Sequence, residues 1–338
     1  MSSATKASGS SAEPTPEMRV EREINMNQQL AAVMYSYGAE GTIKIQPINR
    51  PQVSPGKSLW RSPPQGSERP ARQNCCHRLS EDEGPGPCHQ EQIMQTEKDV
   101  IAVITGSSKG IGKGIAKELG RQGAIVYVTG RDQESVEKVV SEITHAGGQG
   151  VAVVCDMSDD AQIARLFKQV EQKHGYLNIL VNNATTLNSQ MGVKPFWEAT
   201  IHLADILDVG LRSHHVATWH AARLLLAGGR GLIVNVSFYA DAKVHDPAYY
   251  ASKAGLDKLA ASYAEHFAPF NVSAVSLWPG FVATETMVEL ANSDPKTRAL
   301  RDTLGFESPE FCGRVVWALF SDPNLKTLSG STLLTAEV

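Results

Sequence analysis

A tyrosine one helical turn before a lysine offers the chemistry of a proton donor. In the stretch DPAYYASKAG, Tyr249 precedes Lys253 by four residues and Tyr250 precedes it by three. Both spacings place a tyrosine beside the lysine on a helix, so the spacing alone does not choose between them. A free phenol has a pKa of about 10, and a neighbouring ammonium lowers it. We expect one tyrosine to protonate a substrate oxygen, with Lys253 as its electrostatic partner.

A serine at the end of a strand is placed to hold that oxygen. The stretch GLIVNVS has the composition of a buried strand and ends at Ser237, ahead of the tyrosines. When hydride reaches a carbonyl carbon, negative charge develops on the oxygen, and a fixed hydroxyl stabilises it. The predicted catalytic residues are therefore Ser237, Lys253 and one tyrosine.

A glycine-rich segment has the pattern of a phosphate-binding turn. ITGSSKGIGKGIA joins a strand to a helix and contains Gly106, Gly110 and Gly112. Glycine lets the chain turn tightly and lets a phosphate approach the amides, and the start of a helix adds N–H donors and a partial positive charge. The alternative is a glycine-rich turn with no ligand. Because the triplet lies between a strand and a helix, where a dinucleotide-binding loop belongs, we expect a nicotinamide cofactor.

Two cations near this loop favour NADPH. The second strand ends in VYVTGRD and presents Arg131, and Lys109 stands inside the glycine loop. A 2′-phosphate attracts cations, whereas the ribose of NAD is usually held by an acidic side chain. Two alternatives stay open: both cations are ordinary solvated charges, or Asp132 folds back as the acidic partner of NAD.

Polar residues also end the third and fourth strands. The carboxylate of Asp156 could accept a hydrogen bond from an adenine amino group, or it could cap the next helix. The amide of Asn183 could lie beside the cofactor ribose, or it could tie strands together.

Short apolar runs alternate with amphipathic segments from residue 98 onward. Strands are expected in DVIAVIT, AIVYVTG, GVAVVCD, LNILVNN, GLIVNVS and NVSAVSLWPG, with a last short one in STLLTAE. Helical periodicity marks, for example, residues 110–121, 132–145, 159–174 and 199–226. This alternation predicts an α/β fold, a doubly wound parallel sheet of Rossmann type that binds its ligand at the carboxyl ends of the strands. We assign residues 98–338 to this single domain.

Residues 1–97 have a different composition. Ten of the 17 prolines lie there, in stretches such as RSPPQGSERPARQN that show neither helix nor strand periodicity. We expect a disordered N-terminal extension. Its stretch CCHRLSEDEGPGPCH contains Cys75, Cys76, His77, Cys88 and His89, but adjacent cysteines fit no usual zinc-ligand spacing, so no metal site is expected.

Charge and hydropathy exclude several classes of partner. The net charge is −4 and no long basic cluster occurs, so nucleic acid is not an expected partner. No apolar run approaches the roughly 18 residues that cross a bilayer, and no signal-peptide core follows the first methionine. The odd number of cysteines, five, suits a reducing compartment. We expect an intracellular protein that acts on a small molecule.

Four motifs together resemble one superfamily. TGSSKGIG, NNA, the series Ser237, Tyr249 and Lys253, and WPGFVATE occur in the order and approximate spacing of the short-chain dehydrogenases/reductases. The resemblance covers residues 98–338, and the family pattern of a tyrosine, three residues and a lysine selects Tyr249. It also implies that Ile111 lies near the pyrophosphate. The complete cofactor-binding set is then Gly106, Ser108, Lys109, Gly110, Ile111, Gly112, Arg131, Asp156, Asn183, Tyr249, Lys253, Pro279, Val282 and Thr284, of which the last three are implied to hold the nicotinamide carboxamide.

Within the superfamily, three segments look most like the dehydrogenase/reductase member 1 type. These are DVGLRSHH, AVSLWPGFVATE and SDPNLKTLSG. The likeness implies NADPH-dependent reduction of steroid-like or xenobiotic carbonyl compounds, in the cytoplasm or at the endoplasmic reticulum. Substrate specificity would lie in a loop over roughly residues 285–308, whose polar pattern names no ligand.

Three positions depart from the superfamily pattern. Gly210 stands where an asparagine usually completes a proton relay to the lysine, with Asp208 as the nearest polar residue. Phe238 follows Ser237 where many members have a second serine, and Thr185 replaces a common glycine. The alternative function is therefore a catalytically impaired, NADP-binding pseudoenzyme that acts through protein partners.

Two long helices are expected to form a subunit interface. The segments 199–226 and 247–267 are apolar on more than one side, which predicts a homodimer or a larger homo-oligomer. His214, His215 and His220 lie on the first of them, and we expect them to face an interface or solvent rather than a metal ion.

Overall fold

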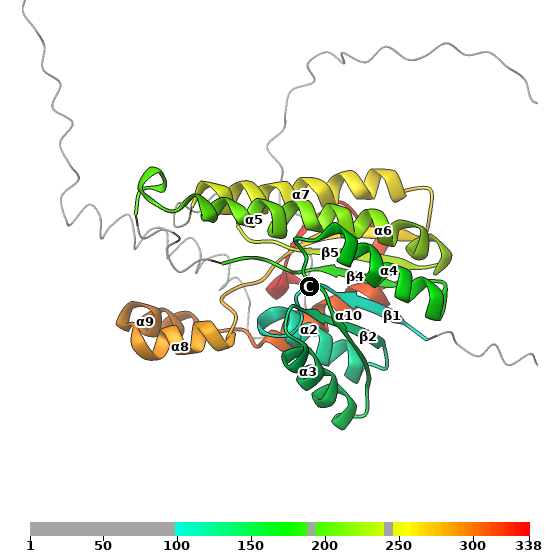
Figure 1. The fold of residues 1–338 in the computed structure, drawn as a ribbon, viewed down its shortest axis with the longest axis horizontal. Helices are drawn as coiled ribbons and strands as arrows, with labels where there is room; N and C mark the ends of the chain where they lie inside the picture. Colours follow the sequence, from blue (N-terminus) through cyan, green and yellow to red (C-terminus); the bar gives the residue numbers. More distant parts are fainter. Residues whose placement is uncertain (1–98, 188–190, 192–193, 240–245) are drawn as a thin grey trace, which may run out of the picture. The chain divides into compact units, whose positions relative to one another are not determined.

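Seven parallel strands form one sheet in the order β3-β2-β1-β4-β5-β6-β7 (Figure 1). The strands are β1 (Ile101–Ile104), β2 (Ile125–Gly130), β3 (Gln149–Val154), β4 (Ile179–Asn182), β5 (Gly231–Val236), β6 (Val272–Trp278) and β7 (Thr332–Leu334). This computed structural model describes residues 99–187, 191, 194–239 and 246–338, all within one compact unit.

The strand order reverses between β1 and β4. From β1 the sheet grows outward to β3, and from β4 it grows in the opposite direction to β7. The predicted doubly wound parallel sheet of Rossmann type is therefore confirmed. In such sheets the crevice at the reversal, beyond the carboxyl ends of the strands, receives the ligand.

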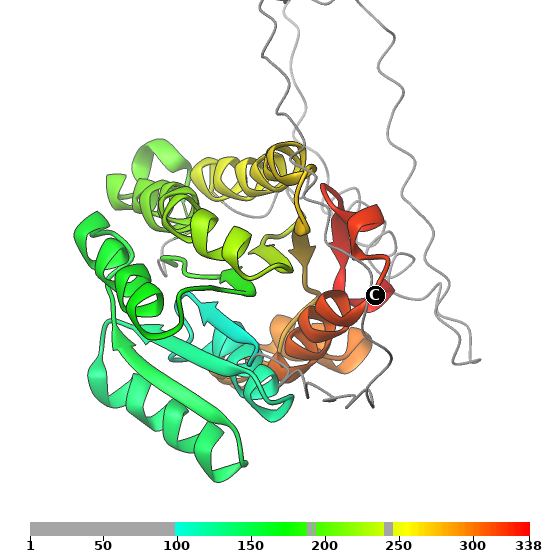
Figure 2. The same cartoon turned by 90° about the vertical axis from the view of Figure 1, so that its right-hand side faces the viewer.

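Helices cover both faces of the sheet (Figures 1 and 2). One face packs against α2 (Gly110–Arg121), α3 (Gln133–His145) and α10 (Pro309–Ser321), and the other packs against α4 (Asp160–His174), α6 (Ser213–Ala227) and α7 (Pro247–Phe267). In β1, Ala102 and Ile104 enter the first core, and Ile101 and Val103 enter the second. All four are fully buried, because a parallel strand covered on both faces has no solvent side.

Polar side chains start the helices. Asp132, Asp159, Asp246, Thr284 and Ser308 each precede a helix and accept a hydrogen bond from a backbone N–H in its first turn. A proline follows Asp246 and Ser308 directly, at the position where a helix needs no N–H. The helix starts that carry the site are thus fixed locally by the sequence.

The segment 199–226 is helical, but its succession of 3₁₀, α-helical and π-helical turns was not predicted. It begins with a 3₁₀ turn, η2 (Ile201–Ala204), and continues through the short α5 (Asp205–Leu207) and a π-helical turn, η3 (Asp208–Arg212), into α6. Gly210 lies in the π turn, and a Cβ there would come within 3.0–3.4 Å of Ile206, Thr185 and Ser252. The expectation of one regular helix is therefore wrong in its first half, because the tight packing at Gly210 accompanies a wider turn.

The expected substrate loop after residue 284 is largely helical. It forms α8 (Glu285–Ser293) and α9 (Pro295–Leu304), which lie beyond the carboxyl ends of the strands, in orange in Figure 1. The remaining short elements are η1 (Phe196–Glu198), α11 (Leu325–Leu328) and η4 (Thr335–Glu337).

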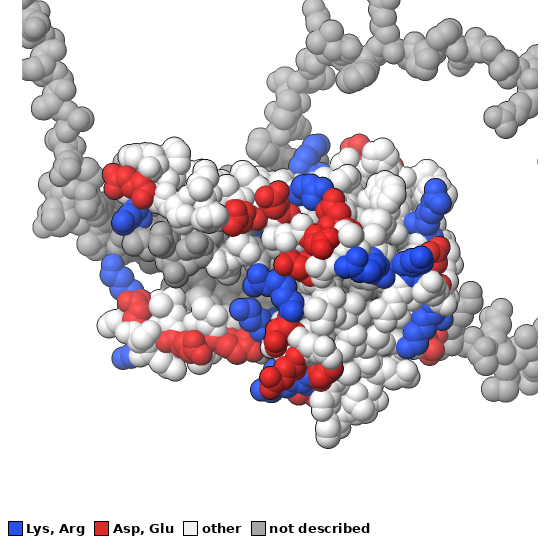
Figure 3. All heavy atoms as spheres, viewed as in Figure 1, with Lys and Arg blue, Asp and Glu red and all other residues white. Residues whose placement is uncertain are grey.

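The described surface carries charges of both signs. On the face shown in Figure 3, lysine and arginine are interspersed with aspartate and glutamate. Within the described residues, no helix has the length and apolarity to cross a bilayer. No group of three or more His, Cys, Asp or Glu side chains in that part could hold a metal ion. The predicted extension of residues 1–97, with Cys75 and its neighbours, lies outside the described residues.

Candidate active site

The glycine turn is held by two hydroxyl groups, that of Ser107 within the motif and that of Thr129 outside it. Thr129 Oγ1, on β2, accepts a hydrogen bond from the Gly106 amide at 3.0 Å, and the Thr129 amide donates to Ser107 Oγ at 2.9 Å. Gly106 and Gly110 have φ angles of 62° and 58°, which favour glycine. The turn between β1 and α2 is thus tied to β2 in a fixed shape.

Asn183 ties β4 to the same turn. Its Nδ2 donates to the carbonyls of Thr105 and Gly106, both at 2.9 Å. A Cβ on Gly112 would lie 2.4 Å from this Nδ2 and 2.6 Å from the Gly106 carbonyl oxygen, so residue 112 must be glycine. Of the two roles left open for Asn183, the structure shows the tie between elements, and its place beside a cofactor stays a prediction.

Arg131 and Lys109 are both exposed beside the turn. Neither forms an ion pair with another residue in the described part of the chain. Asp132 instead caps α3, and its carboxylate accepts from Ser135 N at 2.8 Å and Ser135 Oγ at 2.5 Å. These bonds, both to Oδ2, lower the pKa of Asp132 and tie its carboxylate to the first turn of α3.

Asp156 does not cap α4. Its Oδ1 accepts from the amide and the hydroxyl of Ser158, at 2.9 and 2.8 Å, and so closes a turn. The cap of α4 is Asp159, which accepts from the amides of Ala161 and Gln162. The alternative of a helix cap is therefore wrong for Asp156, because the cap lies three residues later.

Tyr249 and Lys253 meet on α7 as predicted. The Nζ atom of Lys253 lies 5.6 Å from the centre of the Tyr249 ring and donates to the Val236 carbonyl, at the end of β5, at 3.1 Å. Lys253 is 6% exposed. The Tyr250 ring packs edge-on against that of Tyr249, with centroids 5.8 Å apart. The structure thus brings the tyrosine, the lysine and the carboxyl end of β5 together.

Burial governs the ionisation of this pair. It lowers the pKa of Lys253 to about 8, with Asp257 acting in the opposite direction. Burial raises the pKa of Tyr249, and the neighbouring Tyr250 adds to that rise. The expected lowering of the Tyr249 pKa by Lys253 is not found, because desolvation of the phenolate dominates and the ammonium lies over the ring. At neutral pH Tyr249 is a phenol and holds the proton that a reduction needs.

Ser237 is buried at the end of β5, and its hydroxyl points into α7. Its Oγ donates to the Lys253 carbonyl at 3.0 Å. Phe238, the next residue, packs edge-on against Tyr249 with ring centroids 6.2 Å apart. The hydroxyl proton of Ser237 must therefore leave the helix backbone before it can reach a substrate oxygen.

Asp257 is a partly buried acid that sequence reasoning missed. It lies one turn after Lys253 and accepts hydrogen bonds from Ser276 Oγ and, at 3.1 Å, from Trp278 Nε1. Burial raises its pKa, while the bonds from Ser276 and Trp278 and the charge of Lys253 act against that rise. The i to i+4 spacing from Lys253 was its only sequence signal.

The segment after β6 lies against the glycine turn. Pro279 and Val282 are buried, and Thr284 Oγ1 accepts from the Met287 amide at 3.3 Å, which caps α8. A Cβ on Gly110 would lie 3.5 Å from Thr284 Cγ2. In this cap the Thr284 hydroxyl oxygen is an acceptor, so the hydroxyl proton stays available for donation to a ligand.

The two remaining residues of the predicted set belong to the turn itself. Ile111 is partly buried against the α2 side of the core. Ser108 lies at the end of β2, since a Cβ on Gly130 would come within 2.8 Å of Ser108 Oγ. Their contact with a cofactor stays a prediction.

The histidines of α6 are not all at the surface. His214 is 1% exposed, and its Nε2 lies 2.7 Å from the Ala184 carbonyl oxygen. A carbonyl only accepts, so Nε2 carries the proton. Burial, together with a smaller effect of the nearby Lys253 charge, lowers the pKa of His214 to about 3, against the opposing effect of the hydrogen bond to Ala184. The expectation of a surface position is wrong for His214, because its ring is buried and bonded to the Ala184 carbonyl just after β4.

These features agree with the comparisons to known proteins. The family described as short chain dehydrogenase matches residues 100–295. The chain belongs to this family. It is 40% identical to human "Dehydrogenase/reductase SDR family member 1" over 252 residues, which are 70% of this chain and 80% of the human protein. The predicted likeness to the member 1 type is confirmed.

More distant relatives share the fold and the general chemistry. A "3beta-hydroxysteroid dehydrogenase" of Mediterraneibacter gnavus is 29% identical over 61% of this chain and 74% of its own length. A solved structure from Sinorhizobium meliloti, described as a short-chain alcohol dehydrogenase, superposes with a TM-score of 0.59 at 25% identity, over 70% of this chain and 94% of the other. The chain is thus an oxidoreductase of the type that uses NAD(P), and the pseudoenzyme alternative gains no support.

Proposed function

We propose that this protein is an NADPH-dependent carbonyl reductase. The observation that carries the proposal is the pair formed by Tyr249 and Lys253, at the carboxyl end of β5. Tyr249 is a phenol at neutral pH because its pKa is raised. Lys253 remains a cation over most of the physiological range because its pKa is about 8. A proton donor beside a fixed positive charge suits the reduction of a carbonyl group.

The residues around the glycine turn fit a dinucleotide. The left-handed Gly106 and Gly110, the required Gly112 and the first amides of α2 form a cradle for phosphate groups. When bound, the cofactor supplies hydride to the substrate carbon. Tyr249 then gives its proton to the substrate oxygen, and Lys253 stabilises the phenolate that remains. Pro279, Val282 and Thr284 would hold the nicotinamide end.

The preference for NADPH rests on two exposed cations without ion pairs in the described part of the chain. Arg131 and Lys109 can each neutralise part of a 2′-phosphate, and Asp132 is occupied by its cap. We expect tighter binding of NADPH than of NADH in a fluorescence titration. Arg131→Ala should weaken NADPH binding selectively, whereas equal affinities of the wild type for both cofactors would refute the preference.

The proposed substrates are small, hydrophobic ketones and aldehydes of steroid-like or xenobiotic character. The names of the relatives favour this class, since one acts on a 3β-hydroxysteroid. A cytoplasmic setting, or one at the endoplasmic reticulum, stays a prediction.

The test is a screen of carbonyl compounds with NADPH, repeated on two matched variants. Tyr249→Phe removes the acid and keeps the ring, so turnover should fall by about 10²- to 10⁴-fold while NADPH still binds. Tyr250→Phe removes the neighbouring hydroxyl and should retain most activity. Full turnover by Tyr249→Phe on a working substrate would overturn the reductase proposal.

A further inference from the structure

A carboxylate accepts a hydrogen bond from a backbone amide of the phosphate-binding turn. The backbone N–H of Gly110, the first residue of α2, donates to Glu285 Oε2 at 3.0 Å. Glu285 is the first residue of α8, 175 positions further along the chain. The first N–H groups of a helix have no partner within the helix and attract anions. Glu285 therefore sits where a phosphate of the dinucleotide would bind.

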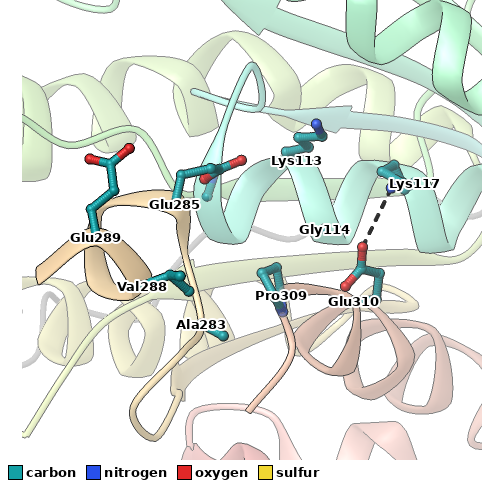
Figure 4. A pocket seen from close by; sticks show the side chains of 10 residues that line it. Lys113, Gly114, Lys117, Ala283, Glu285, Val288, Glu289, Pro309 and Glu310 are labelled. Atoms are coloured by element: carbon teal, nitrogen blue, oxygen red, sulfur yellow. Dashed lines mark hydrogen bonds and ion pairs between the residues drawn. The ribbon is translucent and has the colours of Figure 1, made fainter. Parts of the chain in front are cut away.

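The contact belongs to a close fit between the two helix starts. Thr284, next to Glu285, lies against Gly110, whose Cβ would be 3.5 Å from Thr284 Cγ2. Gly110 and Glu285 line one hollow of about 510 Å³, together with Lys113, Lys117, Glu289 and Glu310 among others. Figure 4 shows Glu285 directed from α8 toward α2. The carboxylate is thus placed by the fold and by its own helix.

The lysines of this hollow are paired with other acids. Lys113 Nζ lies 2.8 Å from Glu142, and Lys117 Nζ lies 3.2 Å from Glu142 and 3.5 Å from Glu310. Glu285 instead has the Gly110 amide as its partner. A carboxylate and a phosphate cannot share one N–H, and their negative charges repel each other.

We propose that Glu285 is a latch on the cofactor site, which holds α8 against the glycine turn until a dinucleotide phosphate displaces it. The inference rests on the proposed function, because it requires a phosphate at the start of α2. Glu285 then lowers the affinity for the cofactor. It also links cofactor binding to the position of α8 and α9, the helices of the segment that is expected to determine substrate specificity.

The experiment compares Glu285→Ala with Glu289→Ala. Glu289 lies one turn later on the same helix and lines the same hollow, but Figure 4 shows Glu285, and not Glu289, directed toward α2. Both variants remove one negative charge from α8, and Glu285→Ala also removes the acidic residue of its first turn. Fluorescence titration with NADPH should show binding about threefold to tenfold tighter for Glu285→Ala, the range for one exposed charge-assisted contact. Glu289→Ala should stay within about twofold of the wild type.

A second readout follows α8 without the cofactor. Hydrogen exchange of residues 285–304 should be faster in cofactor-free Glu285→Ala than in the wild type, because the tie to Gly110 is lost. Adding NADPH should remove most of this difference.

Four results would overturn the latch. Equal tightening by both alanine variants would show a general charge effect, and weaker binding by Glu285→Ala would show that Glu285 holds the cofactor. Unchanged binding by Glu285→Ala while the wild type binds NADPH would refute the latch and leave the proposed function intact. Failure of every variant and of the wild type to bind NADPH would refute the proposed function, and the latch with it.

Discussion

Lys253 is the buried charge on which the site depends. Burial lowers its pKa to about 8, below the ordinary lysine value of about 10.4. The ammonium is therefore present below pH 8 and is lost as the pH rises through that value. Because the unfolded chain keeps the proton to higher pH, burial of the charge costs stability below pH 8, and this cost disappears between pH 8 and about 10.4.

We predict that NADPH affinity falls as the pH rises through about 8. The deprotonated amine loses both the charge and one donor that would serve the cofactor. Fluorescence titrations between pH 6.5 and 9.5 would measure this decline. The Lys253→Arg variant keeps its positive charge throughout that range, so its affinity for NADPH should not change with pH. A flat profile for the wild type would contradict the assignment of Lys253.

Ser237 is the weakest part of the proposed chemistry, because its hydroxyl donates to the Lys253 carbonyl. A hydroxyl rotates at little cost, so we expect it to turn to the substrate oxygen. Ser237→Ala should then lower turnover by about 10²-fold, as for one lost oxyanion donor, with an unchanged dissociation constant for NADPH.

The control for Ser237 is Ser252→Ala. Ser252 is also a fully buried serine beside Lys253, and its Oγ has no hydrogen-bond partner in the described part of the chain. Its removal should leave turnover near the wild-type level. If Ser237→Ala is silent where Tyr249→Phe is inactive, the oxygen is held by another group.

Local motifs predicted the residues whose neighbours lie close in sequence. Gly106, Gly110 and Gly112 follow from one strand–turn–helix pattern, and Lys253 follows from its spacing to Tyr249. Glu285 could not be found this way, because its contact with Gly110 joins segments 175 residues apart. The raised pKa of Tyr249 was missed for a related reason, since burial is set by packing and not by the motif.

At the scale of elements, alternating apolar and amphipathic segments predicted every strand and the doubly wound order of layers. Period and composition determine these features locally. The π turn at Asp208–Arg212 and the helices α8 and α9 were not predicted. The π turn depends on packing around Gly210. The segment of α8 and α9 contains many polar residues, so its apolar residues show no clear helical periodicity.

The contact between α2 and α10 depends on Gly114. A Cβ there would lie 2.2–2.4 Å from the backbone and ring of Pro309, the first residue of α10. Alanine normally stabilises a helix interior by about 1 kcal/mol relative to glycine. We predict the opposite sign for Gly114→Ala, a loss of about 1–3 kcal/mol of unfolding free energy from overpacking. Urea unfolding would measure it.

Gly255→Ala on α7 is the matched comparison. A Cβ at Gly255 would meet only the end of the flexible Leu211 side chain, at 2.8 Å. Leu211 can move, so this variant should be less destabilised than Gly114→Ala. Equal losses, or a stabilised Gly114→Ala, would show that α10 is not seated on Gly114.

At the scale of the whole molecule, α6 and α7 run side by side over one face of the sheet (Figures 1 and 2). Trp219 on α6 is 69% exposed, and Leu226 on the same helix is 40% exposed. An exposed indole on a long helix is typical of a protein interface. A second copy that packs its own α6 and α7 against these helices would bury both Trp219 side chains about a two-fold axis.

We therefore predict a homodimer, or a larger assembly that contains this dimer, with Trp219 in its interface. Light scattering at micromolar concentration should report at least twice the mass of one chain, and Trp219→Glu should shift the protein toward monomer by burying an unpaired charge. Trp197→Glu is the control, because Trp197 is similarly exposed, at 72%, but lies in η1 and not on α6 or α7. A monomeric wild type would refute the interface. Dissociation by Trp197→Glu alone would place the interface at η1, and the exposed face of α6 would then need another partner.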